Sequence, residues 1–234
     1  MKDLHPIQLS ILRNLLLSDG LRYTDIKPDK EMENNQFSFH LNSLIDANLV
    51  LKDEDKYRLT DKGKEWANRM DTDDVKMMTQ AKLSAWCCCV RDVDYGKEVL
   101  VGTRKKQPFY GCQGFVAGKI KFGETIYDAA RRELREEAGL EGNPKLVQVK
   151  HYISYKEGKL VEDKFMFLFS FENPEGEIHA NYEVDLKWVP INELPQFITK
   201  PFKNFEEIKE VVDSVMNFDG NISFVEKVED AENF

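Results

Sequence analysis

The segment GKIKFGETIYDAARRELREEAGL, residues 118–140, places acidic residues on the side of a helix that ought to face the core. A helix advances about 100° per residue, so a helix that begins just after Glu124 has an inward face defined by its apolar residues. These are Ile126, Ala129, Ala130 and Leu134. Glu133 and Glu137 fall within the same arc, and Glu136 lies at its edge. The segment therefore predicts a helix with three carboxylates on or beside its buried face.

Carboxylates on a buried face need a positive partner. Burial of a carboxylate is costly unless a cation meets it, and neighbouring carboxylates repel one another. A divalent cation would offset the cost of burial and reduce the repulsion between the carboxylates. Hard oxygen ligands on a rigid helix suit Mg²⁺ or Mn²⁺. The alternative interpretation is that the glutamates of RRELREE, residues 131–137, form ordinary surface ion pairs, which contribute little to stability.

The whole segment, taken as one pattern, favours the metal site. Nine of its positions match a known signature: Gly118, Glu124, Arg132, Glu133, Leu134, Glu136, Glu137, Gly139 and Leu140. This pattern resembles the signature of the Nudix hydrolases, and a weaker resemblance extends over residues 82–217. The resemblance implies an α/β fold, the Nudix α/β/α sandwich with a mixed sheet. It differs before the first glycine, where relatives often have proline and glycine and this chain has Val116 and Ala117.

The resemblance also implies roles for residues of the segment. Glu133, Glu136 and Glu137 would bind the metal, with the carbonyl of Gly118 as a further ligand. One of these glutamates, or another acid, would take a proton from the attacking water as general base. Arg132 would orient a neighbouring carboxylate.

In the same pattern, Glu124 would fix the loop to the helix. Together these residues imply hydrolysis of a nucleoside diphosphate linked to another group, with water attacking phosphorus and a glutamate-held metal neutralising the phosphate oxygens.

Three residues outside the segment are further candidates. Arg104 stands where relatives of the MutT type offer a cation to substrate phosphates, and Lys105 is expected to assist it. The alternative is an exposed cluster at the end of a strand. Glu183 matches an acid that many family members place before a tryptophan-containing strand, where it can join the metal site. The alternative for Glu183 is a surface carboxylate.

The first 70 residues predict a separate small domain. Apolar residues recur at helical spacing in residues 5–17 and 36–50, and an alternating segment follows as a hairpin would. This order, with the phrases FHLNSLIDANLV and YRLTDKGKEW, resembles winged-helix domains, which are of the α+β class. We therefore expect a winged-helix domain over residues 1–70, a partly helical linker over 71–82, the Nudix domain over 83–217 and a loose acidic tail over 218–234.

Whether the N-terminal domain binds DNA is left open by its charge. Residues 1–70 hold 11 Lys and Arg against 12 Asp and Glu, and the expected recognition helix, residues 36–47, contains no Lys or Arg. Affinity for DNA backbones depends on such cations. The candidate base contacts are Ser38, His40, Asn42 and Ser43. The alternative is a domain that mediates homodimerisation or contacts another protein.

Composition limits the remaining possibilities. The chain has 234 residues and a formal net charge of −9, which argues against a surface built throughout for nucleic acid. No apolar run approaches the roughly 20 residues that span a bilayer, and the four cysteines form no CxxC pair. We expect a cytoplasmic enzyme without membrane contact, acting on a nucleotide-type substrate that the sequence does not specify. The rival interpretation is a nucleotide-sensing transcriptional regulator.

Overall fold

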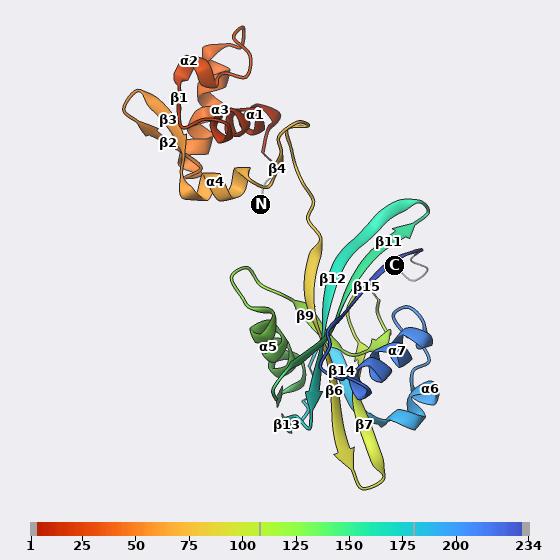
Figure 1. Cartoon of the computed structure of the whole chain (residues 1–234). Helices are drawn as coiled ribbons and strands as arrows, with labels where there is room; N and C mark the ends of the chain where they lie inside the picture. The colour runs from red at the N-terminus through yellow and green to blue at the C-terminus, as the bar shows by residue number, and fades with distance from the viewer. Residues whose placement is uncertain (1–3, 108, 180, 231–234) are drawn as a thin grey trace. The chain divides into compact units, whose positions relative to one another are not determined.

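A computed structural model describes residues 4–107, 109–179 and 181–230. The chain forms two compact units, Met1–Thr79 and Gln80–Phe234, which are seen in Figure 1. The division falls within the segment expected to be a linker. Among the described residues, no helix has both the length and the apolar character needed to cross a bilayer.

The described part of the N-terminal unit contains four helices and a small antiparallel sheet. Its elements are α1 (Pro6–Leu16), β1 (Leu21–Arg22), α2 (Tyr23–Ile26), α3 (Asn34–Asp46), β2 (Val50–Asp53), β3 (Lys56–Leu59) and α4 (Asp61–Ala67). The strand order is β1-β3-β2, and one apolar cluster, including Leu12, Phe37 and Leu44, joins the helices to the hairpin. These are the helices and hairpin that the sequence predicts, and their assignment to the winged-helix class stays a prediction.

Two of the four candidate base contacts on α3, Ser38 and His40, are engaged within the N-terminal unit. His40 is buried and its ring stacks on His5 at 4.4 Å between ring centroids, whereas the Ser38 hydroxyl is hydrogen-bonded to the Tyr23 hydroxyl at 2.7 Å. Asn42 is exposed as expected, and Phe39 beside it is 68% exposed. His40 is buried because it lies three positions after Phe37, on the apolar face of α3.

Most of the segment expected to be a partly helical linker belongs to the N-terminal unit and is not helical. It forms a small hairpin from β4 (Met70–Asp71) and β5 (Lys76–Met77), and Met70 packs in the apolar cluster of that unit. The carboxylate of Asp71 accepts hydrogen bonds from the backbone N–H groups of Asp73 and Asp74, each at 3.0 Å. This side-chain turn competes with helix formation, and the predicted partial helix was therefore wrong.

The C-terminal unit is built on an eight-stranded mixed sheet. The strands are β6 (Lys82–Val93), β7 (Gly96–Arg104), β8 (Gln113–Gly114), β9 (Val116–Lys119), β11 (Lys145–Lys156), β12 (Lys159–Glu172), β14 (Val184–Pro190) and β15 (Ser223–Asp230). The main order is β14-β7-β6-β12-β11-β15, with β8 paired to β7 and β9 to β6. The pairs β12–β6 and β11–β15 are parallel and the others are antiparallel. Two short strands, β10 (Leu140–Glu141) and β13 (Glu175–Gly176), pair separately.

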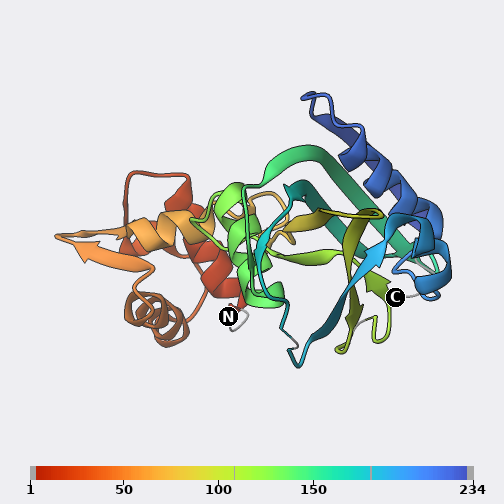
Figure 2. The same ribbon diagram turned by 90° about the horizontal axis from the view of Figure 1, so that it is seen from below.

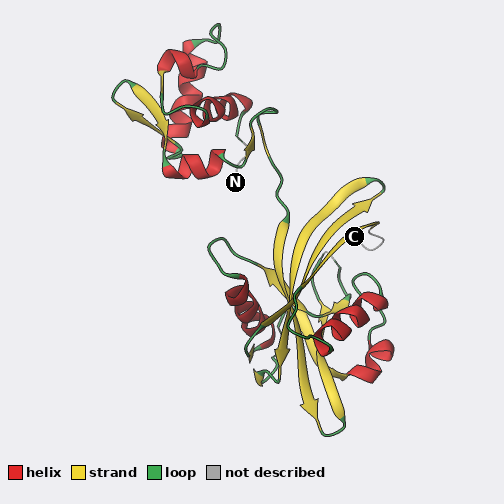
Figure 3. Ribbon diagram, in the orientation of Figure 1, coloured by secondary structure: helices red, strands yellow, loops and turns green. Residues whose placement is uncertain are grey.

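Helices cover both faces of this sheet, as Figures 1, 2 and 3 show. They are α5 (Ile126–Ala138) on one face, and α6 (Leu194–Phe197) and α7 (Phe205–Met216) on the other, with the 3-10 turn η1 (Ile191–Glu193) before α6. The predicted α/β sandwich with a mixed sheet is thereby confirmed.

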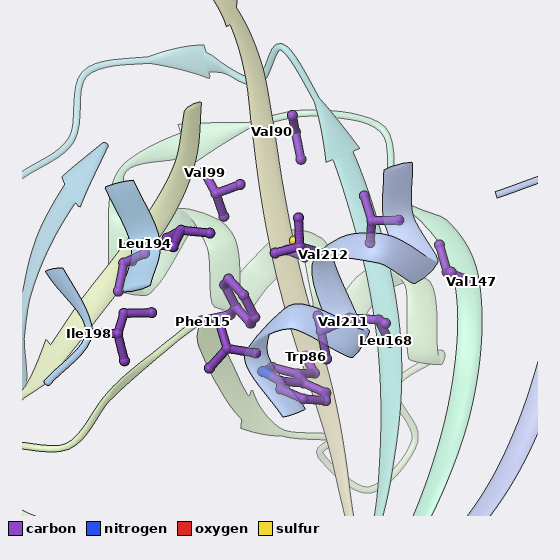
Figure 4. Packing of buried hydrophobic residues seen from close by; sticks show 14 of the residues in the cluster. Trp86, Val90, Val99, Phe115, Val147, Leu168, Leu194, Ile198, Val211 and Val212 are labelled. Atoms are coloured by element: carbon purple, nitrogen blue, oxygen red, sulfur yellow. The ribbon is translucent and has the colours of Figure 1, made fainter. Parts of the chain in front are cut away.

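Successive side chains of β6 point to opposite faces of the sheet and contribute to the hydrophobic cluster on each face. Cys87 and Cys89 pack under α5, whereas Trp86, Cys88 and Val90 pack under α7, as expected for a strand buried on both faces. Figure 4 shows the cluster on the α7 face, where Val211 and Val212 of α7 meet Trp86 and Leu168 of the sheet. The four cysteines are free and buried.

The expected acidic tail is instead, over Ser223–Asp230, the edge strand β15. It runs parallel to β11, with Gln148 opposite Ser223 and Tyr155 opposite Asp230. Two of its acidic residues have partners: Glu226 lies 2.8 Å from the His151 ring, and Glu229 forms an ion pair with Lys203. A half-exposed strand that is rich in charged residues resembles a polar tail in composition, which is why the prediction for these residues was wrong.

Candidate active site

Helix α5 begins and ends at residues suited to those positions. The Thr125 hydroxyl accepts a hydrogen bond from the Asp128 N–H at 3.1 Å, which satisfies one of the open donors of the first turn. The helix ends at Gly139, whose φ of 72° lies in the left-handed region favoured by glycine. These ends set the rotation of α5, so that Ala129, Ala130 and Leu134 pack on the sheet.

Glu133 lies on that buried face, and its carboxylate lies against Gly118. Only 9% of its side chain is exposed. Gly118 belongs to β9, opposite Ala85 of β6, and a Cβ atom added to it would fall 1.8 Å from Cδ of Glu133. The space in which the Glu133 carboxylate sits therefore exists only because residue 118 is glycine. Ala117 causes no strain, since β9 is extended at this point.

Arg132 connects the loop to the helix. Its guanidinium bonds both carboxylate oxygens of Glu124, at 2.7 Å and 2.9 Å. It also donates to Glu133 at 2.6 Å, to Glu136 at 3.0 Å and to the carbonyl of Lys119 at 2.9 Å. The five donors of an arginine fit such a set of oxygens. Arg132 thus ties two of the α5 glutamates to the loop that precedes the helix.

The environments of Glu124 and Glu133 shift the pKa values of these two acids in opposite directions. The hydrogen bonds from Arg132 lower the pKa of Glu124 to about 2. Burial raises the pKa of Glu133, and Arg132 opposes the rise only in part. Glu133 is therefore a carboxylate whose negative charge is insufficiently compensated by the protein.

Replacing Glu124 with Gln should remove a pH-dependent part of the stability. Glu124 titrates near 4.5 when unperturbed and at about 2 in the folded protein, so its contribution is present above pH 4.5 and is lost as the pH falls toward 2. We expect Glu124→Gln to lower the free energy of unfolding at pH 7 by about 1–3 kcal/mol. The difference from wild type should shrink between pH 4.5 and pH 2, as measured by urea unfolding.

The matched control is Glu141→Gln, because Glu141 forms an exposed ion pair with Arg135 at 3.1 Å, and such pairs contribute little. A difference between wild type and Glu124→Gln that is equal at pH 7 and pH 2.5 would show that the Arg132–Glu124 pair is not the source of the effect.

The other two α5 glutamates are more accessible. The Glu136 side chain is 55% exposed and lies 3.7 Å from the ammonium of Lys121 as well as beside Arg132. Glu137 is partly exposed. Arg104, at the end of β7, lies close enough to Glu137 for this carboxylate to oppose the lowering of the arginine's pKa by burial. Arg104 and Glu137 therefore interact electrostatically.

Lys105 and Glu183 have partners away from α5. The Lys105 ammonium lies 2.9 Å from Asp185 and donates to the carbonyl of Asn181 at 2.9 Å. The Glu183 carboxylate forms an ion pair with Lys106. The contacts of Glu183 do not support the prediction that it joins the α5 acids, because its carboxylate is paired with the Lys106 side chain of the neighbouring loop.

Asn181 organises this loop and was not identified from the sequence. Its side chain donates to the backbone carbonyl of Glu137 at 2.9 Å and accepts from the N–H groups of Glu183 and Val184 at 2.7 and 2.8 Å. Asn181 therefore connects the end of α5 to the start of β14. Asparagine commonly holds turns in this way, but nothing local in NYEVD signals a partner 44 residues away.

The donor set fits a hard divalent cation. Glu133, Glu136 and Glu137 offer carboxylate oxygens within two turns of one helix, and Glu133 is desolvated against Gly118, where a cation would compensate its charge. Within the described part of the chain, no three acidic, histidine or cysteine side chains converge closely enough to enclose a metal. Because Arg132 holds Glu133 and Glu136, cation binding would require the carboxylates to turn from it in part.

Comparisons with known proteins agree with this geometry. The family model described as NUDIX domain matches residues 81–213, which is more than half of the chain. An oxidized purine nucleoside triphosphate hydrolase of Danio rerio is 33% identical over 100 residues, which make up 42% of this chain and 61% of that protein. An ADP-ribose pyrophosphatase of Methanocaldococcus jannaschii is 38% identical over 48 residues, 20% of this chain and 28% of that protein. The chain thus spans less than two thirds of these curated relatives.

Two solved structures share the fold. The NUDIX domain of Shewanella oneidensis NrtR, complexed with ADP ribose, has a TM-score of 0.50 and 16% identity, with coverage of 66% of this chain and 98% of that one. The MutT protein of Bacillus halodurans has a TM-score of 0.50 and 22% identity, with coverage of 62% and 89%. The sheet with helices on both faces is that of a Nudix domain. The chain belongs to the Nudix family.

Proposed function

We propose that this protein is a metal-dependent hydrolase of nucleoside diphosphates linked to another group, such as a nucleoside triphosphate or ADP-ribose. The observation that carries the proposal is the Glu133 carboxylate, buried against Gly118 on a helix that also presents Glu136 and Glu137. The names of the relatives, a nucleoside triphosphate hydrolase and an ADP-ribose pyrophosphatase, support the same substrate class.

Each residue of the site has a distinct role in the proposed reaction. Glu133, Glu136 and Glu137 would hold Mg²⁺ or Mn²⁺, with Gly118 allowing the close approach of Glu133. When bound, the cation would neutralise phosphate charge and lower the pKa of water. One of the glutamates would accept the proton of the attacking water. Arg132 and Glu124 would hold the carboxylates in position.

Arg104 would contact the substrate phosphates, since a guanidinium can bond two oxygens at once. The contacts of Lys105 with Asp185 and of Glu183 with Lys106 argue for positioning roles in this loop rather than direct contact with substrate or metal.

A substrate panel tests the proposal. Nucleoside triphosphates, oxidized purine nucleoside triphosphates, ADP-ribose, dinucleoside polyphosphates and nucleotide sugars would each be incubated with the full chain and Mg²⁺. Release of phosphate, pyrophosphate or nucleoside monophosphate would be measured by chromatography. We expect at least one class to be hydrolysed well above the rate without enzyme. Absence of turnover for every class, with Mg²⁺ or Mn²⁺, would contradict the proposal.

The second candidate function is transcriptional regulation by DNA binding, and it is favoured by exposed polar residues on α3. Asn35, Gln36, Phe39 and Asn42 are exposed there, and asparagine and glutamine can read adenine edges. We infer that any DNA affinity would be confined to a specific operator.

We expect weak binding to random duplex DNA at physiological salt, because the exposed face of α3 carries no cation for the phosphates. Fluorescence anisotropy with a labelled random duplex checks this expectation, with Asn42→Ala as the variant and the same duplex at low salt as the positive condition. Tight binding that weakens steeply with salt would contradict it and would indicate a cationic surface elsewhere in the chain.

A further inference from the structure

Glu137 lies at the end of α5, where a helix is least constrained. The helix ends at Ala138, so Glu137 occupies its last turn. The carbonyl groups of a last turn have no partner within the helix, and helix ends fray. Arg132 holds the other two glutamates of the site, through bonds to Glu133 at 2.6 Å and to Glu136 at 3.0 Å. The position of Glu137 therefore depends on a different set of contacts.

The segment before β14 supplies partners for the carbonyl groups at this end of α5. The Asn181 side chain donates to the Glu137 carbonyl at 2.9 Å, from 44 residues further along the chain. The backbone N–H of His179 donates to the Ala138 carbonyl at 3.3 Å. The two segments are in close contact, since a Cβ atom added to Gly139 would lie 2.1 Å from Nδ1 of His179. Of these contacts, the bond from Asn181 is made by a side chain, so a substitution can remove it.

The oxygen of the same amide fixes the start of β14. Oδ1 of Asn181 accepts hydrogen bonds from the backbone N–H groups of Glu183 and Val184, at 2.7 and 2.8 Å. Val184 is paired with Arg104 of β7, and the Glu183 carbonyl accepts a hydrogen bond from the Lys105 N–H at 2.7 Å. One side chain thus links the end of α5 to the end of β7.

The orientation of this amide follows from its partners. Its oxygen meets two N–H donors and its nitrogen meets a carbonyl acceptor, so an inverted amide would lose all three bonds. Asn181 is partly buried, where a lost hydrogen bond is costly. Aspartate has the same shape and keeps the acceptor, but an ionised carboxylate cannot donate. The two functions of Asn181 can therefore be separated by substitution.

We propose that Asn181 is a positioning residue of the α5 site, which holds Glu137 in a fixed place relative to Arg104. Its bond to the Glu137 carbonyl would keep the last turn of α5 formed when the carboxylate engages a divalent cation or the attacking water. The inference rests on the proposed function, since it assumes that Glu137 serves one of these two. Substitution of residues that hold a metal ligand in place commonly lowers metal affinity or activity by about 10- to 100-fold.

Two substitutions at Asn181 separate its functions. Asn181→Ala removes all three bonds, whereas Asn181→Asp keeps the acceptor for the two N–H groups and removes the donor to the Glu137 carbonyl. The matched control is Asn217→Ala. The Asn217 side chain also donates to a helix carbonyl, that of Asp213 at 2.9 Å, but it lies at the end of α7, which packs on the opposite face of the sheet.

Two quantities are measured on the full chain. Mn²⁺ affinity without substrate is obtained from the electron paramagnetic resonance signal of the free ion, which does not depend on turnover. Values of kcat and KM are measured with Mg²⁺ on the best substrate of the panel. We expect both Asn181 variants to bind Mn²⁺ more weakly and to have a lower kcat, by about 10- to 100-fold. KM should stay within about threefold in Asn181→Asp, and Asn217→Ala should match wild type in all three quantities.

A double-mutant cycle tests whether Asn181 acts through Glu137. Asn181→Ala is introduced into Glu137→Gln, and Mn²⁺ affinity and kcat are compared with those of Glu137→Gln alone. If Asn181 acts through this carboxylate, the added substitution should change both by less than about threefold, because interacting residues are not additive. A merely structural role would leave the two substitutions independent. The full loss caused by Asn181→Ala would then reappear, and this result would overturn the inference.

Mn²⁺ affinity and kcat within twofold of wild type in Asn181→Asp would also overturn it, as would the absence of Mn²⁺ binding by the wild type. If wild type hydrolyses nothing but loses Mn²⁺ affinity on Asn181 substitution, and does so only while Glu137 is present, the proposed function fails and the inference stands. If hydrolysis needs Mg²⁺ and both Asn181 variants keep wild-type kinetics and Mn²⁺ affinity, the inference fails and the function stands.

Discussion

Glu137→Gln should lower kcat on the best substrate by about 10²- to 10⁴-fold, the range found when a catalytic acid or base is removed. The substitution keeps the shape of the side chain and removes its charge. Glu137 is partly exposed, on the helix face that carries Glu133, and we propose that it serves the metal or the attacking water. Because Arg104 acts on the same carboxylate, a modest change in KM is also expected. Steady-state kinetics at saturating Mg²⁺ measures both.

The control is Glu141→Gln, which removes an exposed glutamate just beyond the same helix. Its kinetics should match those of wild type within about twofold. A folded Glu137→Gln protein with wild-type turnover would exclude Glu137 from the chemistry, and a comparable loss in Glu141→Gln would point to a general effect of charge.

Gly118→Ala should abolish most of the activity by displacing Glu133. The added methyl group would lie 1.8 Å from Cδ and 1.9 Å from Oε2 of that side chain, so either the carboxylate or β9 must move. Movement of a catalytic group by about an ångström commonly lowers rates by about 100-fold. Overpacking should also lower the free energy of unfolding by about 1–3 kcal/mol. Turnover and thermal melting would be recorded on the same preparation.

Ala117→Ser is the matched control, because Ala117 is exposed and neighbours Gly118 on β9. It adds one heavy atom on the solvent side and should leave both quantities unchanged. Full activity in Gly118→Ala would mean that the carboxylate position seen against Gly118 is not required for turnover.

The helix of the site was predictable because its signals are local. Thr125 caps its start, Gly139 ends it, and the apolar stripe fixes its rotation, all within one segment. The burial of Glu133 follows from the same stripe. The strands β6 and β12 were predictable because long apolar runs of this kind are typical of strands buried on both faces.

Strand β15 was not predictable, because its partners are distant. It pairs with β11, so that Gln148 lies opposite Ser223, and its sequence, SFVEKVED, is rich in charged residues on a half-exposed edge. The partners of Glu183 and Lys105 were missed for the same reason. Their ion pairs, with Lys106 and Asp185, depend on how the loop before β14 is held by Asn181.

The central claim is that the α5 carboxylates promote attack of water on phosphorus with a divalent cation. Hydrolysis of the best substrate in ¹⁸O-labelled water, with and without EDTA, tests it most directly, with the products read by mass spectrometry. The account predicts that the label enters a phosphate group of one product, that EDTA stops turnover and that added Mg²⁺ or Mn²⁺ restores it. Turnover that persists undiminished in EDTA, or label found outside the phosphate groups, would contradict the account.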